Sequence, residues 1–132
     1  MSDKPNKSER FDIVTMNRSQ ITEHPQNPRH IDDDSRKRLR RVIKEHGLVE
    51  PLIVNKRTGR LVGGHQRLSI MDGIERGKDY ELTVSLIDVD EKEEKALLIA
   101  LNNPSAQGVW NVDILEQMLN EEVDWEAVGF TP

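Results

Sequence analysis

The segment Arg-Leu-Val-Gly-Gly-His-Gln-Arg-Leu-Ser-Ile-Met, residues 60–71, has the residue types and spacing of an anion-binding loop. Its first apolar residues end a short strand, and a glycine pair then allows a sharp turn. Apolar residues at helical spacing follow at once, at positions 68, 71 and 74. The first N–H groups of a helix have no partner within it, and the helix dipole favours negative charge there. This order of elements predicts a phosphate-binding site that consists of Gly63, Gly64, His65, Gln66 and Arg67.

Three side chains in or near this loop are candidates for chemistry. Arg67 is a cation in the first helical turn, where the dipole opposes it, so its position indicates an anionic ligand nearby. His65 is interpreted as a phosphate contact or a general base, or alternatively as a helix-cap hydrogen bond. Glu50, which precedes Pro51 at a strand start, is a candidate catalytic acid or a plain exposed acid. Because the sequence has no paired carboxylates at metal spacing and its histidines are scattered, we predict no resident metal site.

The elements that must position this loop form a small α+β domain. We expect strands near residues 11–14, 51–54, 60–62 and 80–89, and helices over 32–47, 64–73, 91–101 and 111–119. The apolar run at residues 96–101 predicts that the third helix is the most buried one. The residues of the first helix expected to face the core are Leu39, Val42, Ile43 and His46. Those of the fourth helix are Val112, Leu115, Met118 and Leu119.

Composition limits the class of protein. The 132 residues suffice for one domain, and because only five of them are aromatic, aliphatic side chains must form the core. The absence of cysteine excludes disulfides, thiolate chemistry and cysteine-ligated zinc. No apolar run approaches the roughly 18 residues of a membrane span, and the polar N-terminus is not a signal peptide. We therefore predict a cytoplasmic protein with no membrane partner.

The net charge of −5 is unevenly distributed along the chain. Residues 1–78 hold 17 Lys and Arg against 11 Asp and Glu, whereas residues 79–132 hold 2 against 13. An acidic total argues against coating nucleic acid by charge alone, but a local basic face is allowed. The outward face of the expected first helix is either a solvated surface or a contact for nucleic acid or nucleotide phosphates, and it carries Arg36, Lys37, Arg38, Arg40, Arg41 and Lys44.

Four motifs occur in a recognisable order. They are Pro28-Arg29 in a stiff loop, His-Gly-Leu-Val-Glu-Pro-Leu-Ile-Val at 46–54, Leu-Val-Gly-Gly-His-Gln-Arg-Leu at 61–68 and Ala-Leu-Asn-Asn at 100–103. This order resembles the ParB N-terminal domain, which has the ParB/sulfiredoxin fold, and covers roughly residues 11–120. It is most similar to stand-alone or methyltransferase-associated ParB-like domains of phages and mobile elements. The resemblance implies a small mixed sheet flanked by about four helices.

The resemblance also implies a nucleotide site at the glycine loop. Partition ParB domains carry Gly-Glu-Arg-Arg at this turn and bind CTP with magnesium, and sulfiredoxins carry Gly-Gly-Cys-His-Arg and bind ATP. The glycine and the final arginine carry over to Gly64 and Arg67, so phosphate binding carries over with them. The reactive position holds His65, which excludes sulfiredoxin chemistry. The expected ligand is CTP or ATP, with or without magnesium.

Two further pairs of residues join the site through the resemblance. Asn27 and Arg29 lie in the proline loop, and Asn102 and Asn103 end the third helix. Partition proteins end that helix with Glu-Asn-Leu-Gln-Arg, whose acid this sequence lacks. An amide oxygen holds a metal only weakly, so nucleotide binding is favoured over hydrolysis.

Three functions are consistent with these patterns. One is a nucleotide-responsive binding module in DNA partition, DNA modification or phage DNA processing. Another is a nuclease, NTPase or small-molecule kinase on the same fold, with His65, Arg67 and Glu50 as its candidate residues. The third is a protein-interaction domain with a vestigial phosphate loop, in which the acidic C-terminal half is the docking surface.

The expected organisation is a disordered tail at residues 1–10, the ParB/sulfiredoxin-like domain at 11–120 and a C-terminal extension at 121–132. We expect the sequence to be a fragment of a longer protein. DNA would be contacted by the basic helix or by a missing C-terminal domain. Because ParB-like domains often self-associate when they bind their ligand, a homodimer is a further expectation from the resemblance.

Overall fold

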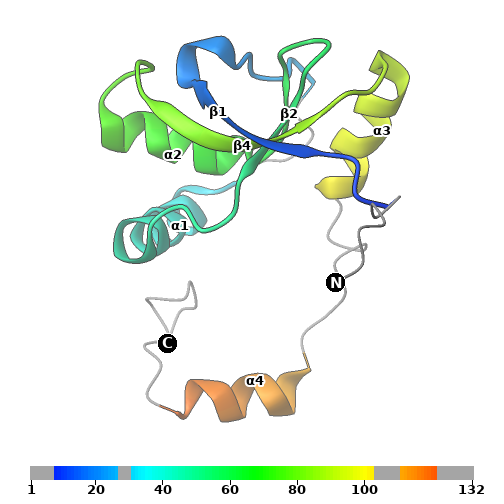
Figure 1. The fold of residues 1–132 in the computed structure, drawn as a ribbon. Coiled ribbons are helices and arrows are strands. Elements are labelled where there is room, and N and C mark those ends of the chain that lie inside the picture. The colour runs from blue at the N-terminus through cyan, green and yellow to red at the C-terminus, as the bar shows by residue number, and fades with distance from the viewer. Residues whose placement is uncertain (1–7, 27–30, 103–110, 122–132) are drawn as a thin grey trace, which may run out of the picture.

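The computed structural model describes residues 8–26, 31–102 and 111–121, and they contain a four-stranded mixed sheet (Figure 1). The strands are β1 (Asp12–Asn17), β2 (Leu52–Asn55), β3 (Leu61–Gly63) and β4 (Glu81–Ile87), in the spatial order β1-β4-β2-β3. β4 is antiparallel to β1 and parallel to β2, and β2 is antiparallel to β3. The predicted α+β class and mixed sheet are confirmed.

Alternating apolar residues place the core on one face of this sheet. Leu82 and Val84 of β4 are buried while Glu81 and Thr83 are exposed, the pattern of a half-buried strand. β2 lies beside β4, with Leu52 opposite Val84 in register. The buried cluster on this face consists of Ile21, Leu52, Val54, Leu61, Leu68, Leu82 and Val84. Because Leu68 belongs to the helix that follows the glycine loop, this core fixes the position of the loop itself.

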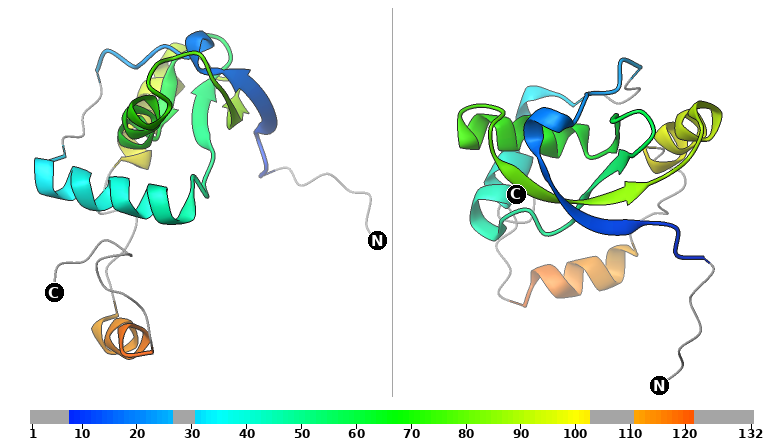
Figure 2. Two further views of the ribbon diagram at one scale, coloured as in Figure 1. Left: turned by 90° about the vertical axis from the view of Figure 1, so that its left-hand side faces the viewer. Right: turned by 45° about the horizontal axis from the view of Figure 1, so that its top comes forward.

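With one exception, the helices begin at a residue whose side chain caps them, and Figure 2 shows two further views of their arrangement. They are the 3-10 helix η1 (Arg18–Gln20), α1 (Asp33–His46), α2 (His65–Glu75), α3 (Glu91–Leu101) and α4 (Val112–Leu119). The Asp32 carboxylate accepts from Ser35 N at 2.7 Å, and Asp90 caps α3 in the same way. α1 ends at Gly47, whose φ of 78° favours glycine. The predicted elements are all present at these positions.

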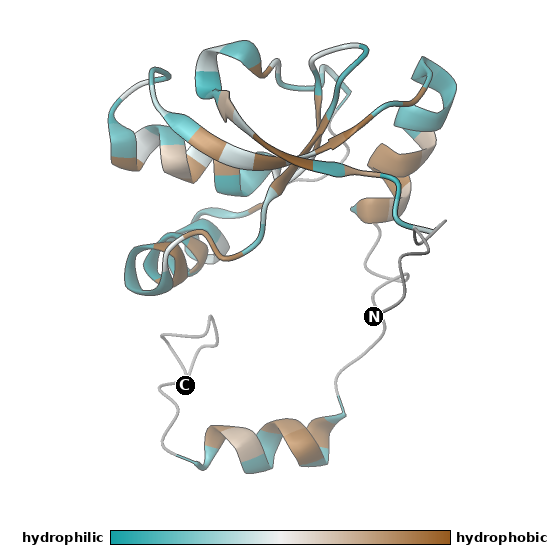
Figure 3. Ribbon diagram, in the orientation of Figure 1, coloured by the Kyte–Doolittle hydropathy of each residue, from teal (hydrophilic) through white to brown (hydrophobic). Residues whose placement is uncertain are grey.

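Three burial predictions are wrong for the described residues. α3 is not the most buried helix: although Figure 3 shows its C-terminal part as apolar, most of its residues are exposed, Ile99 at 57%, whereas most residues of α2 are at least partly buried. His46 is exposed at the end of α1, beyond the packed part of that helix. On α4, Val112 is 67% exposed and Met118 is 56% exposed. Figure 1 shows that this helix lies away from the sheet. Leu119 alone among the predicted α4 residues is fully buried.

A buried ion pair fastens α2 to the end of β1. Arg18 is 2% exposed, and its Nε and Nη2 donate to the two carboxylate oxygens of Asp72 at 2.9 and 3.0 Å. The Tyr80 hydroxyl donates to the same carboxylate at 2.6 Å. Burial raises the pKa of Tyr80, and the bond to the Asp72 carboxylate adds to the effect. This bidentate pair holds α2, and so the loop before it, against the sheet.

Parts of several predictions lie outside the described residues. They are the N-terminal tail up to residue 7, the C-terminal extension from residue 122 on, and the site residues Asn27, Arg29 and Asn103. The domain boundaries predicted from the sequence stay predictions. No helix among the described residues is long and apolar enough to cross a membrane.

Candidate functional site

The glycine loop joins the end of β3 to the start of α2, as the sequence predicts. Gly64 is the N-cap of α2, with φ of 95° and no side-chain cap. A Cβ at this position would overlap Leu52 Cδ2 and would lie 3.1 Å from Arg67 Nη2. Glycine is therefore required twice here, for the backbone conformation and for the close approach of two side chains. The start of α2 is partly exposed, and the backbone N–H groups of a helix start are the arrangement that binds anions.

A pocket of about 380 Å³ opens at this loop. It brings together parts of the chain that are distant in sequence, from the start of α1 to the end of α3. One side is the loop with Arg67 and Glu50, and apolar side chains form much of the rest. Its lining residues are Ile31, Leu39, Glu50, Ile53, Gly63, Gly64, His65, Gln66, Arg67, Leu101 and Asn102. The structure thus collects the loop residues, Glu50 and Asn102 in one place, while their predicted roles stay predictions.

His65 is incompletely satisfied. Both of its ring nitrogens are buried, and neither has a hydrogen-bond partner among the residues that the structure describes. Burial lowers the pKa of His65, the nearby His24 lowers it further, and Glu23 opposes the shift. The imidazole is therefore neutral near pH 7, with one donor and one acceptor nitrogen. Because buried polar atoms without partners cost free energy, these two atoms indicate a place where a ligand or water is expected.

Arg67 is held by Glu50 from across the pocket. Its Nη1 donates to the Glu50 carbonyl oxygen at 3.1 Å and to the Glu50 carboxylate at 3.3 Å. The side chain of Arg67 is 24% exposed and that of Glu50 is 78% exposed. Glu50 was a candidate catalytic acid from the sequence, and here its carboxylate is turned towards the arginine. Asn102 is also oriented, because its Nδ2 donates to Leu98 O at 2.7 Å.

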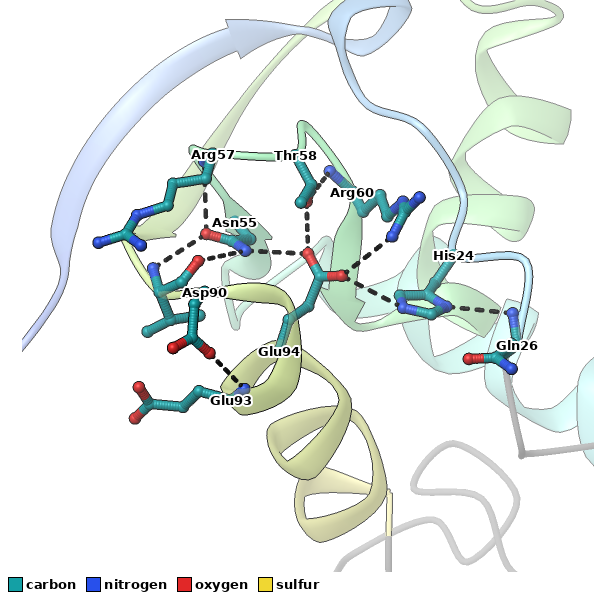
Figure 4. A network of polar contacts seen from close by, with 10 residues as sticks. His24, Gln26, Asn55, Arg57, Thr58, Arg60, Asp90, Glu93 and Glu94 are labelled. Atoms are coloured by element: carbon teal, nitrogen blue, oxygen red, sulfur yellow. Dashed lines mark hydrogen bonds and ion pairs between the residues drawn. The ribbon is translucent and has the colours of Figure 1, made fainter.

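A second polar cluster, around Glu94 of α3, was not predicted from the sequence (Figure 4). Glu94 is 1% exposed, and its carboxylate accepts from Asn55 Nδ2 at 2.9 Å and from Arg60 Nη1 at 3.4 Å. The Thr58 hydroxyl is a third donor. Burial would raise the pKa of Glu94, but the hydrogen bonds from Thr58, Asn55 and Arg60 hold it below its ordinary value. The carboxylate is therefore ionised at neutral pH.

His24 completes this cluster. Gln26 N donates to His24 Nδ1 at 3.1 Å, so in the neutral ring Nε2 carries the hydrogen and points at Glu94, 3.3 Å away. A second pocket, of about 420 Å³, lies beside this pair and is lined by His24, Pro25, Gln26, Arg60, Glu91, Lys92, Glu94 and Lys95. One sequence signal could have revealed Glu94: it stands three and four residues before Leu97 and Leu98, on the stripe that α3 buries.

The cations of α1 are less available than the sequence suggested. Lys37 and Lys44 are exposed, but Arg36, Arg38, Arg40 and Arg41 are only partly exposed. Arg40 Nη1 lies 3.4 Å from where a Cβ on Gly73 would stand, because α1 packs against α2. Arg41 Nε donates to Glu45 at 3.0 Å within the same helix. Contact of this helix with nucleic acid stays a prediction, and only part of the predicted cation face is open to solvent.

Among the described residues, no group of three or more His, Cys, Asp or Glu side chains could hold a metal ion. Of the described residues that line the first pocket, Glu50 alone carries a carboxylate. A magnesium ion that entered with a nucleotide would take most of its ligands from phosphates and water.

The fold is a small mixed sheet with a glycine loop between β3 and α2. Residues 2–102 match the family model of the ParB N-terminal domain. Because this match spans well over half of the 132 residues, the chain belongs to that family. The resemblance stated from the motifs is thereby confirmed at the level of the family.

Solved structures agree on the fold. One similar structure is the C-terminally truncated chromosome-partitioning protein ParB from Caulobacter crescentus complexed with CTP-γ-S, at 16% identity and a TM-score of 0.67, covering 91% of this chain and 72% of that one. Another is the C2221 form of a Pnob8-like ParB-N domain, at 17% identity and a TM-score of 0.59, covering 84% of this chain and 49% of that one. A search of the curated proteins found no match.

Proposed function

We propose that this chain binds a nucleoside triphosphate, CTP or ATP, with its phosphates at the loop from Gly63 to Arg67. The observation that carries the proposal is the 380 Å³ pocket, whose lining combines a helix N-terminus, the Arg67 guanidinium and His65 with apolar walls. Phosphates need N–H donors and a cation, and a base needs an apolar surface. CTP is the first ligand to test, because the similar Caulobacter crescentus protein is complexed with CTP-γ-S.

The proposed role is that of a ParB-like module in DNA partition, DNA modification or phage DNA processing. Membership of the ParB N-terminal domain family supports this role. Binding is proposed in preference to hydrolysis, because the Glu50 carboxylate is engaged with Arg67 and the residue at the end of α3 is the amide Asn102. Self-association on nucleotide binding belongs to the same proposal, and light scattering on the same samples measures it.

Calorimetric titration with CTP, ATP and GTP, with and without magnesium, tests the proposal. For at least one nucleotide we expect a dissociation constant between about 1 μM and 1 mM. Arg67→Ala should weaken binding by roughly tenfold to a hundredfold, because it removes a charge-assisted hydrogen bond to phosphate. Arg57→Ala is the matched control, since this exposed arginine pairs with Asp88 and is not a lining residue of the pocket. The proposal fails if no nucleotide binds to the folded wild-type protein.

A further inference from the structure

One guanidinium nitrogen of Arg67 has two different contacts with the same residue. Nη1 donates to the backbone carbonyl of Glu50 at 3.1 Å and to its carboxylate at 3.3 Å. The other nitrogens of the group lie over Gly64, 3.1 and 3.4 Å from where a Cβ would stand. Pro51 follows Glu50 and restricts the backbone of Glu50 to an extended conformation, which limits the directions that the Glu50 carbonyl can take. The main chain of Glu50 therefore orients the arginine independently of the side chain.

The two side chains differ in how easily they can move. The Glu50 side chain is 78% exposed, whereas that of Arg67 is 24% exposed and lies beside the glycine loop. A carboxylate that is mostly in water can leave the pair with little change elsewhere, because water replaces its lost contact. The guanidinium would stay in place, since the carbonyl bond does not depend on the carboxylate.

We propose that the Glu50 carboxylate is an internal competitor for the phosphate at Arg67 and so sets the affinity of the site. This inference rests on the proposed nucleotide binding. An arriving phosphate has to displace the carboxylate from Nη1, and both are anions that seek the same donor. After displacement the carbonyl of Glu50 keeps Arg67 aimed at the phosphate. Glu50 therefore has two opposite effects on the site. Its backbone carbonyl orients Arg67 for the phosphate, and its carboxylate competes with the phosphate for Arg67.

Glu50→Gln tests the competition, because it removes the charge and leaves the carbonyl in place. We expect CTP to bind roughly two- to fivefold more tightly, because this factor corresponds to the free energy of an exposed ion pair that the phosphate no longer has to break. The gain should shrink as salt is raised, because the repulsion between carboxylate and phosphate is screened. Glu81→Gln is the matched control: it removes one exposed acid from β4, which is not among the residues that line the pocket. That variant should bind as the wild type does.

The outcomes separate this inference from the function on which it rests. If neither the wild type nor Glu50→Gln binds any nucleotide, both the proposed function and the competition are wrong. If the wild type binds and Glu50→Gln binds equally or more weakly, only the competition is wrong. Weaker binding confined to magnesium-containing buffer would instead make Glu50 a metal ligand, and slower turnover at unchanged affinity would make it a catalytic acid or base. Tighter binding in Glu50→Gln but not in Glu81→Gln supports the competition.

Discussion

Two polar clusters of this protein contain the same three residue types and differ in how completely these are paired. Around Glu94, the histidine and the arginine are His24 and Arg60, and the carboxylate is 1% exposed. At the glycine loop the corresponding trio is His65, Arg67 and Glu50, and the side chain of that acid is 78% exposed.

Pairing distinguishes the roles of the two clusters. The buried carboxylate of Glu94 accepts from four side chains, and both nitrogens of His24 have partners. The nitrogens of His65 have none among the described residues, and the Glu50 side chain that pairs with Arg67 is 78% exposed. A buried polar group that is fully paired stabilises or specifies a fold, whereas unpaired groups beside a pocket are suited to a ligand. Residue types alone do not separate the two cases.

Removal of the Glu94 carboxylate should have the largest effect on stability. Glu94→Ala leaves His24 Nε2 and the Thr58 hydroxyl without their acceptor, and it leaves Asn55 Nδ2 with the Val89 carbonyl alone. Breaking a buried charged network typically costs about 3–5 kcal/mol. Urea unfolding followed by circular dichroism measures this loss. The affinity for CTP of the fraction that stays folded should change less than it does in Arg67→Ala.

Glu93→Ala is the control for this variant, because it removes the neighbouring acid of the same helix from an exposed position. Its effect should stay within about 0.5 kcal/mol, as for most surface substitutions. Equal stability of the two variants would show that the cluster around Glu94 does not hold the fold together. Failure of Glu94→Ala to fold at all, with Glu93→Ala folded, would agree with the expected cost.

Gly64→Ala should have the next largest effect and should damage both stability and binding. An alanine there would have to adopt the left-handed backbone conformation of Gly64, and its Cβ would overlap Leu52 Cδ2. Positive φ costs a non-glycine residue about 1–2 kcal/mol, and overpacking typically about 1–3 kcal/mol more. The same Cβ would press on the Arg67 guanidinium, so CTP affinity measured by calorimetry should fall as well.

Gly47→Ala separates the two contributions. Gly47 also has a positive φ, of +78°, with a ψ of −177° where Gly64 has 27°, and nothing lies within 4 Å of a Cβ there. Gly47→Ala should therefore lose stability through the backbone alone, because this conformation is open essentially only to glycine, and should keep the wild-type affinity for CTP. If Gly64→Ala also keeps the wild-type affinity, the close packing at Gly64 does not matter to the site.

The sequence predicted the elements because their signals are local. The helix predicted over residues 32–47 and the strand predicted near residues 80–89 each depend on neighbours in the chain, and both are confirmed, as α1 and β4. The glycine loop belongs to the same class, since strand, turn and helix follow one another directly.

The sequence did not predict contacts that depend on distant residues. Nothing local marks His24 and Glu94 as partners, because 70 positions separate them and a histidine or an acid is ordinarily a surface residue. The burial of α3 was overestimated for a related reason: composition counts apolar residues, whereas burial depends on which stripe meets β3, so Ile99 stays exposed. The engagement of Arg67 by Glu50 likewise required the fold.

His65→Phe should have the smallest effect, and it should be stabilising. The phenyl ring is somewhat larger than imidazole, but it replaces two buried nitrogens without partners by carbon, so the free energy of unfolding should rise by about 1 kcal/mol at pH 7.5. Because burial lowers the pKa of His65 in the folded protein, the unfolded chain binds a proton more readily as the pH falls below about 6.5. The wild type should therefore lose stability between pH 7.5 and 5.5, and the variant should lose less.

His46→Gln is the control, because it removes an exposed histidine at the end of α1. Its pH dependence in urea unfolding should follow that of the wild type. If His65→Phe gains stability and loses affinity for CTP, the unpaired nitrogens of the wild type serve binding and lower the stability of the fold. The paired nitrogens of His24 would then differ from them in role. A stability loss in His65→Phe at pH 7.5 would show instead that the imidazole is already satisfied without a ligand, and the distinction between the two clusters would then disappear.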